Sequence, residues 1–177
     1  MSTVSPTNVP GYFKVYTDLV SEKRLATAFT IQSQEIKYLF SSITDDQAGY
    51  AYAPGKWTIR ELMQHLMDAE RIFCYRALCF ARKDTVILPS FDENEYAVNS
   101  FANTRSWQDL LEEFISLRKS TLHLFNSFTP GMLEMTGKAG ANTLSVEQCG
   151  FIIIGHLAHH IKIIRDRYLS QPAGSLQ

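Results

Sequence analysis

The sequence of 177 residues lacks the features that mark several large classes of protein. Its Lys and Arg residues form no cluster of the kind that binds nucleic acid, and the formal net charge is only −1. The longest apolar stretch, Phe151 to Ile154, is far too short to span a bilayer. The residues before Gly11 contain neither the basic nor the apolar region of a secretory signal. We therefore expect no nucleic-acid partner and no membrane association.

Cysteine is scarce, and the few cysteines follow no familiar pattern. Cys74, Cys79 and Cys149 form neither a CxxC motif nor an even disulfide framework, which is typical of reduced thiols in a cytoplasmic protein. The chain also lacks a Ser-His-Asp arrangement, a phosphate-binding loop and a dinucleotide-binding fingerprint. With 45% apolar and 20% charged residues, the composition is that of an ordinary globular protein. The length favours one domain over residues 1–177, with its core at about 12–169.

Helical periodicity is strong in four segments, whereas the alternation typical of strands is weak. The first segment covers about 12–40, with a break expected near Ser21. The second begins at the capping box Thr58-Ile-Arg-Glu61 and continues to about Arg82. A helix that starts at such a box and carries an apolar face is well defined by sequence alone.

A polar link over 83–105 follows, with a short helix expected after Asp92. The link is long for a hairpin, which indicates a crossover between the two ends of a bundle. Two further helical segments lie at about 106–128 and 145–169, and Gly155 inside the last one predicts close packing there. The pattern predicts an all-α four-helix bundle with its long connection between the second and third helices.

Three histidines indicate a metal site. His156 and His160 are four residues apart, so on a helix they leave the same face with a rotation of only about 40°. Neutral imidazoles are costly to bury without a partner, and a divalent metal is a natural one. His65 borders the apolar face of the second helix and would supply the third ligand if the two helices adjoin at that level. The alternative is that each histidine is satisfied by an ordinary hydrogen bond in the core.

The sequence leaves the roles of two residues near these histidines undecided. His159 either replaces one of the pair in an i, i+3 arrangement or lines the site. Asp68, three residues after His65, either accepts the second ring N–H of that histidine or is a solvated charge or an ion-pair partner of Arg71. No residue is assigned a catalytic role from sequence.

The remaining candidates have simpler interpretations. His123 points away from the apolar stripe of its helix and is expected at the surface. Cys149 is expected to be core material. Arg76 and Arg167 each lie eleven residues beyond a candidate ligand, about 16 Å along a helix. They would bind an anionic ligand in a long cleft, or else form salt bridges beside the core.

Three stretches give the chain a resemblance to a known family. They are Lys56-Trp-Thr-Ile-Arg-Glu-Leu-Met-Gln-His-Leu-Met-Asp-Ala-Glu-Arg-Ile-Phe-Cys-Tyr-Arg76, Gly155-His-Leu-Ala-His-His-Ile-Lys-Ile-Ile-Arg-Asp-Arg-Tyr168 and Leu88-Pro-Ser-Phe-Asp-Glu-Asn-Glu-Tyr96. Over about 12–169 the chain resembles the DinB/YfiT-like superfamily, in its DinB_2-type branch. The resemblance implies an up-down-down-up four-helix bundle that forms a homodimer. It also implies a divalent metal (nickel or zinc, with iron or manganese as alternatives) held by His65, His156 and His160.

The resemblance leaves several functions open. Related members transfer low-molecular-weight thiols or isomerise substrates with their help, and others are regarded as metal-dependent hydrolases. Our main hypothesis is a metalloenzyme that activates a thiol or water for a small-molecule substrate. Thiol transfer is favoured because no carboxylate is clearly placed as a general base, and a thiol ionises more readily than water. The alternatives are a hydrolase and a non-catalytic metal-binding or stress-response module. A wide cleft that reaches the metal would favour catalysis.

Overall fold

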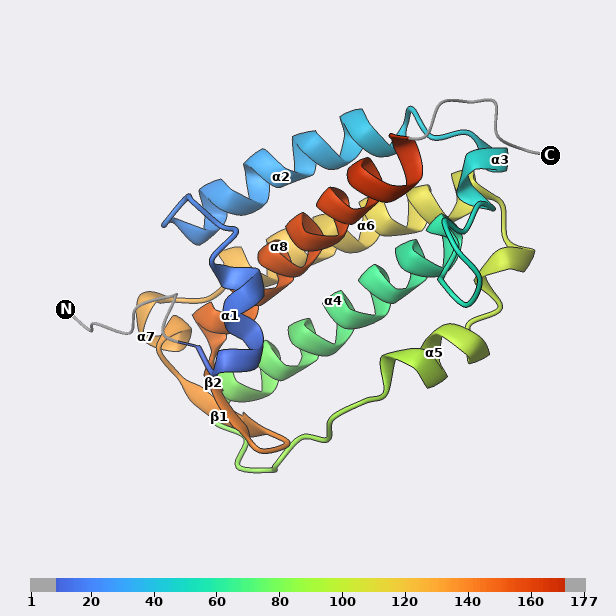
Figure 1. Cartoon of the computed structure of the whole chain (residues 1–177). Helices are drawn as coiled ribbons and strands as arrows, with labels where there is room; N and C mark the ends of the chain where they lie inside the picture. Colours follow the sequence, from blue (N-terminus) through green and yellow to red (C-terminus); the bar gives the residue numbers. More distant parts are fainter. Residues whose placement is uncertain (1–8, 171–177) are drawn as a thin grey trace.

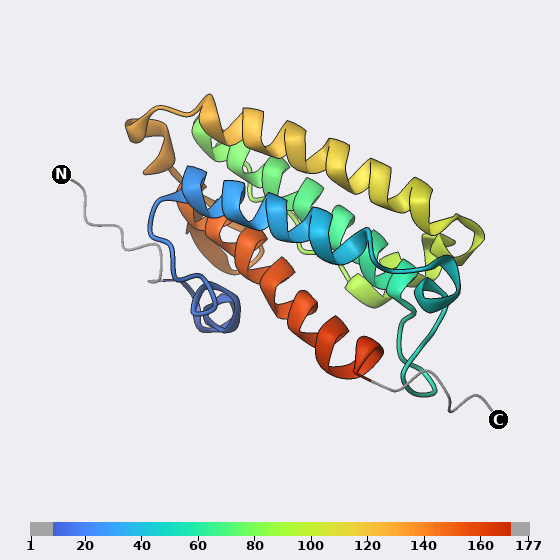
Figure 2. The ribbon, with the colours of Figure 1, turned by 90° about the horizontal axis from the view of Figure 1, so that it is seen from above.

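The computed structural model describes residues 9–170 and consists mainly of helices packed lengthwise (Figures 1 and 2). In this part of the chain the long helices are α2 (Leu25–Phe40), α4 (Ile59–Ala81), α6 (Trp107–Asn126) and α8 (Val146–Ile163). The shorter elements are α1 (Gly11–Thr17), α3 (Asp45–Ala48), α5 (Glu93–Asn99), η1 (Ala102–Thr104), α7 (Pro130–Leu133), β1 (Thr136–Ala139), β2 (Asn142–Ser145) and η2 (Ile164–Leu169), the last a π-helical turn that continues α8.

The starts of the two helices that carry the histidines are fixed by side chains. Thr58 and Glu61 form the predicted capping box of α4, with the Thr58 hydroxyl 3.1 Å from the backbone nitrogen of Glu61. Ser145 and Gln148 form the equivalent box of α8. Each box satisfies backbone N–H groups that have no partner inside the helix. Both predicted helix starts are confirmed.

The first helical segment is broken around Ser21, as predicted, and its two parts differ in direction. The short helix α1 is seen end-on where α2 and α8 are seen lengthwise, so it runs across the bundle (Figure 2). It packs directly onto the backbone of α8, because a Cβ atom built on Gly155 would lie only 2.2 Å from the carbonyl oxygen of Tyr16. Gly155 therefore permits the close packing that its position in the sequence predicts.

A β-hairpin between α7 and α8 was not predicted. Strands β1 and β2 pair antiparallel, and Gly140 in the turn between them has a φ of +56°. The hairpin packs against the end of α4, since a Cβ on Gly137 would lie 1.9 Å from the ring of Phe80. The strands have only four residues each, and β1 contains a glycine, so their sequence shows little alternation.

The link between α4 and α6 contains the predicted short helix. The carboxylate of Asp92 caps α5 by accepting from the backbone nitrogens of Asn94 and Glu95. Upstream of this helix, Leu88 is tied to the hairpin: its nitrogen donates to the Lys138 carbonyl at 3.0 Å, and its carbonyl accepts from the Gly140 nitrogen at 2.8 Å. The link thus follows a fixed path over the outside of α4.

The core of the bundle contains one buried polar network. Arg118 of α6 donates to Glu70 of α4 at 2.7 Å, and both side chains are 3% exposed. Thr121 donates to the second Glu70 oxygen at 2.6 Å, and Arg118 donates to the Gln32 side chain at 2.8 Å. Gln32 of α2 in turn donates to the Ile154 carbonyl of α8 at 2.7 Å. The network therefore joins all of the long helices. No helix within residues 9–170 is long and apolar enough to cross a membrane.

The contact between α1 and α8 gives a first prediction. Replacement Gly155→Ala should lower the free energy of unfolding by about 1–3 kcal/mol, because the new methyl group would overlap the Tyr16 carbonyl. This loss should exceed the gain of up to about 1 kcal/mol from better helix propensity. Urea denaturation measures the difference, and Gly131→Ala, where nothing lies within 4 Å of the new Cβ, is the control. A stabilised Gly155→Ala variant would contradict the packing.

Candidate metal centre

The three predicted histidines converge. The Nε2 atom of His65 on α4 lies 3.0 Å from Nε2 of His156 on α8, and Nε2 of His160 lies 3.1 Å from the same atom. All three candidate ligand nitrogens lie within 4.8 Å of one another. The structure thus places α4 and α8 side by side at the level that the sequence could not establish.

This arrangement suits a divalent cation. Ligands at about 2.0–2.1 Å from a metal are separated by about 2.9–3.4 Å in octahedral or tetrahedral coordination, which includes both measured separations. Nε2 of His156 faces two other ring nitrogens, and a single nitrogen cannot donate a proton to both. A metal ion would accept all three lone pairs. The donor set, three neutral imidazoles, is one that zinc, nickel and iron accept.

Burial keeps these imidazoles neutral. It lowers the pKa of His65 to about 4, an effect that the Glu93 carboxylate partly opposes. Burial, together with the neighbouring imidazoles His65 and His159, lowers the pKa of His160 to about 3. The pKa of His156 falls well below its ordinary value for the same reason, burial first and then its neighbouring histidines. Neutral rings are the form that binds a metal.

A cavity of about 460 Å³ lies against the histidines. One wall is a stripe along α4 made by His65, Ala69, Phe73 and Arg76, and α8 contributes Ile152, His156, His159 and His160. The cavity is not sealed, because Tyr12, another lining residue, is 65% exposed. Its volume is within the range of small-molecule sites. His159 therefore lines this cavity together with the three candidate ligands.

The sequence analysis missed three residues that lie beside the histidines. Tyr16 of α1 packs edge-on against His156, with ring centroids 5.2 Å apart, and burial raises the pKa of its phenol to about 12. Trp57 lies 4.9 Å from His65 between ring centroids. Glu93 of α5 lines the cavity and is the only carboxylate that does so within residues 9–170. Glu93 falls in a matched family stretch, but nothing in its spacing relates it to the histidines.

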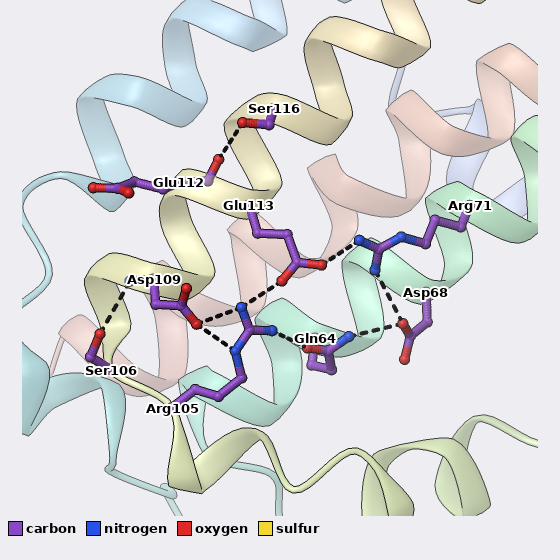
Figure 3. Close-up of polar contacts among 9 residues, drawn as sticks. All are labelled: Gln64, Asp68, Arg71, Arg105, Ser106, Asp109, Glu112, Glu113 and Ser116. Atoms are coloured by element: carbon purple, nitrogen blue, oxygen red, sulfur yellow. Dashed lines mark hydrogen bonds and ion pairs between the residues drawn. The ribbon is translucent and has the colours of Figure 1, made fainter.

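Asp68 does not contact His65. Its carboxylate accepts from Gln64 at 2.9 Å and lies 3.6 Å from Nη1 of Arg71. Figure 3 shows Asp68 at the edge of an ion-pair network between α4 and α6, in which Arg71 and Arg105 both bind Glu113. This network is outside the cavity and links helix surfaces.

The structure also shows which of the other candidate residues lie at the cavity and which do not. His123 is exposed, as predicted. Cys149 is fully buried, and burial raises the pKa of its thiol to about 12, so it is neutral core material. Arg76 lines the cavity, whereas Arg167 is exposed and lies over the Tyr52 ring at 5.6 Å.

The comparisons with known proteins agree with the helical fold. The family model of the DinB superfamily matches residues 28–164, and the chain belongs to this superfamily. No curated protein matches the chain in sequence. Among solved structures, it is similar to YfiT from Bacillus subtilis, a probable metal-dependent hydrolase with an unusual four-helix bundle topology. That match has a TM-score of 0.67 at 19% identity and covers 80% of this chain and 84% of YfiT.

A second solved structure is the mycothiol-dependent maleylpyruvate isomerase. It matches with a TM-score of 0.63 at 11% identity, over 77% of this chain but only 57% of the isomerase. At these identities the two likenesses show a shared fold. The histidine cluster itself shows three side chains that could hold a metal ion.

The lowered pKa values predict how the metal-free protein responds to acid. A histidine whose pKa falls on folding binds its proton more readily in the unfolded chain, so stability decreases as the pH falls below 6.5. For His65 the loss should continue to about pH 4. The slope should approach about 1.4 kcal/mol per pH unit for each such histidine. Urea denaturation between pH 7.5 and 4.5, with chelator present, measures it.

The test variant is His160→Gln, which should lower the slope of this pH dependence by the share of one histidine. The control variant is His123→Gln, which should leave the slope unchanged. A free energy of unfolding that stays constant from pH 7 to pH 5 would show that the imidazoles are not held neutral by burial.

Proposed function

We propose that this protein is a metal-dependent enzyme that transfers a low-molecular-weight thiol to a small electrophilic substrate. The observation that carries the proposal is the convergence of three neutral imidazoles on the wall of a cavity of about 460 Å³. His65, His156 and His160 would hold the metal through Nε2. Nickel and zinc are the preferred ions, with iron or manganese as alternatives.

The bound ion would act as a Lewis acid that favours the thiolate over the thiol. The walls around it are aromatic: Phe13, Phe73 and Trp57 all line the cavity and would exclude water from the reacting groups. Glu93 would accept the thiol proton at a carboxylate oxygen. The Tyr16 phenol keeps its proton, given its pKa of about 12, and would donate a hydrogen bond to the substrate.

The thiol would come from a small molecule because the chain offers none at the site. No cysteine within residues 9–170 lines the cavity. Burial also raises the pKa values of Cys74 and Cys149 to about 12 each, which keeps both thiols protonated. A free thiol with a pKa near 8.5 ionises far more readily than water.

Hydrolysis is the second candidate, and Glu93 favours it. The sequence argument against water as the nucleophile rested on the lack of a suitably placed carboxylate, and Glu93 provides one at the cavity. The similarity to YfiT supports the same alternative. A non-catalytic metal-binding or stress-response role is less favoured, because such a site needs no cavity of this size.

The proposal also includes the helix order and the homodimer that the resemblance to the family implies. The colour gradient in Figure 1 supports an up-down-down-up order of α2, α4, α6 and α8, with the long crossover between α4 and α6. A homodimer is also part of the proposal, since large apolar side chains such as Tyr38 and Val98 are 84% and 73% exposed.

The dimer can be tested by its mass. Light scattering at tens of micromolar protein should give about twice the 20.1 kDa of the chain. A monomer mass over the whole concentration range would contradict the dimer and leave the metal site unaffected.

The ligand assignment predicts a selective loss of metal. Single replacements His65→Ala, His156→Ala and His160→Ala should each reduce bound metal from about one ion per chain to well below that, because each removes one of three protein ligands. Elemental analysis of protein purified without chelator measures the content. His123→Ala is the control and should bind metal normally. Full metal content in any of the three variants would exclude that residue as a ligand.

The activity itself is tested with an electrophile and several thiols. Metal-loaded protein should conjugate monochlorobimane to at least one small thiol at least about tenfold faster than the metal-free His156→Ala variant does. Ester and amide substrates are tested in parallel. Hydrolysis without conjugation would replace thiol transfer by the second candidate function. Equal rates for the two proteins in every assay would favour the non-catalytic role.

A further inference from the structure

Arg76 occupies the cavity at a distance from the histidines. It lies eleven residues after His65 on α4, which corresponds to about 16 Å of helix and to nearly the same face. Both residues line the same cavity. Arg76 is nevertheless only 6% exposed, so its guanidinium is enclosed by the protein and the cavity rather than by bulk water.

This buried guanidinium has no counter-charge in the part of the chain that the structure describes. Its one hydrogen bond runs from Nη2 to the carbonyl oxygen of Pro89, at 2.9 Å, and its Nε–H is buried without an acceptor. The ionisable group that acts on it is Cys149, a protonated thiol. Burial lowers the pKa of Arg76. An unpaired buried charge is costly, so a partner is expected.

Comparison with Arg118 shows that Arg76 lacks a carboxylate partner. Arg118 is equally enclosed, at 3% exposed, and binds the Glu70 carboxylate at 2.7 Å. Arg118 is therefore paired with an anion in the bundle core, whereas Arg76 forms no ion pair within residues 9–170. A guanidinium presents its N–H groups in a planar fork that fits a carboxylate or phosphate.

The guanidinium is also held in place. It lies over the ring of Phe73, with its central carbon 5.0 Å from the ring centroid. The Pro89 carbonyl that it binds follows Leu88, which is fixed to the hairpin by two backbone hydrogen bonds. Ser90 and Asn142, from the same two segments, line the cavity and offer further polar groups. A cation that is fixed in this way is typical of a binding site, whereas a surface charge is surrounded by solvent.

We propose that Arg76 forms an anion-binding subsite, which takes the carboxylate or a similar oxyanion of a ligand whose reactive group lies at the three histidines. The ligand is therefore an elongated anionic small molecule. The negative Glu93 acts on His65 and Tyr16 at the other end of the cavity, so it does not compete for Arg76. This inference rests on the proposed function, because it uses the metal site to place the reactive group.

The test uses thiols that differ only in their far end. Cobalt(II)-loaded protein is titrated with ω-mercaptoalkanoates of three to ten carbons and with the matching ω-mercaptoalkanols, and the thiolate-to-cobalt absorption band reports binding. At the best chain length the alkanoate should bind about tenfold to a hundredfold more tightly than the alkanol, as charge-assisted hydrogen bonds allow.

Substitutions show which residue causes the preference for the alkanoate over the alkanol. Arg76→Gln should abolish the preference for the alkanoate while leaving alkanol binding and cobalt content unchanged. Arg76→Lys should retain part of it, because the charge remains but the fork is lost. Arg167→Gln, the same change at an exposed arginine outside the cavity, should retain it fully. Equal binding of alkanoate and alkanol by the wild type, or a preference that survives Arg76→Gln, would overturn the subsite.

A metal-free measurement separates this inference from the proposed function. If no thiol produces the band, the proposed thiol chemistry fails, and the subsite is then decided by thermal denaturation of the metal-free protein with hexanoate or hexanol. A larger rise in Tm with hexanoate, absent in Arg76→Gln, would support the subsite. The same Tm with both compounds would refute it.

Discussion

The geometry of the histidine cluster depends on a charged pair buried in the bundle. Arg118 and Glu70 are enclosed together, and a buried charge that loses its partner is strongly destabilising, so the pair restricts how α6 can pack on α4. Gln32 extends this constraint from Arg118 to the carbonyl of Ile154, two residues before His156. One chain of hydrogen bonds thereby sets the relative positions of the helices that bring the histidines together.

Polar groups in this protein fall into two kinds according to their partners. The buried network of Arg118, Glu70 and Gln32 pairs its charges within the bundle and serves its architecture. In contrast, Arg76 has no counter-charge within residues 9–170, and the three histidines turn their ring nitrogens toward one another. All four residues line one cavity. Because a buried charge without a partner is costly, Arg76 and the histidine cluster together mark this cavity as the place where the folded protein interacts with something else.

Sequence reasoning succeeded where the deciding contacts are local. The capping box at Thr58, the helix start at Ser145 and the spacing of His156 and His160 depend on residues within one turn or two. It failed where contacts join distant segments. Asp68 was considered because it is close in sequence to His65, whereas Glu93 reaches the cavity from a separate helix. The hairpin was missed because its short strands are defined by packing on Phe80 rather than by an apolar pattern.

The cavity is enclosed largely by segments outside the long helices. Three lining residues come from α1 (Tyr12, Phe13 and Tyr16), and three come from the link between α4 and α6 (Ser90, Phe91 and Glu93). Residues 139–142 lie at the tip of the hairpin. The bundle thus supplies the histidines, and the peripheral segments supply most of the remaining surface that a ligand would meet. In evolution, the choice of ligand could therefore change through these short segments while the bundle and its histidines were conserved.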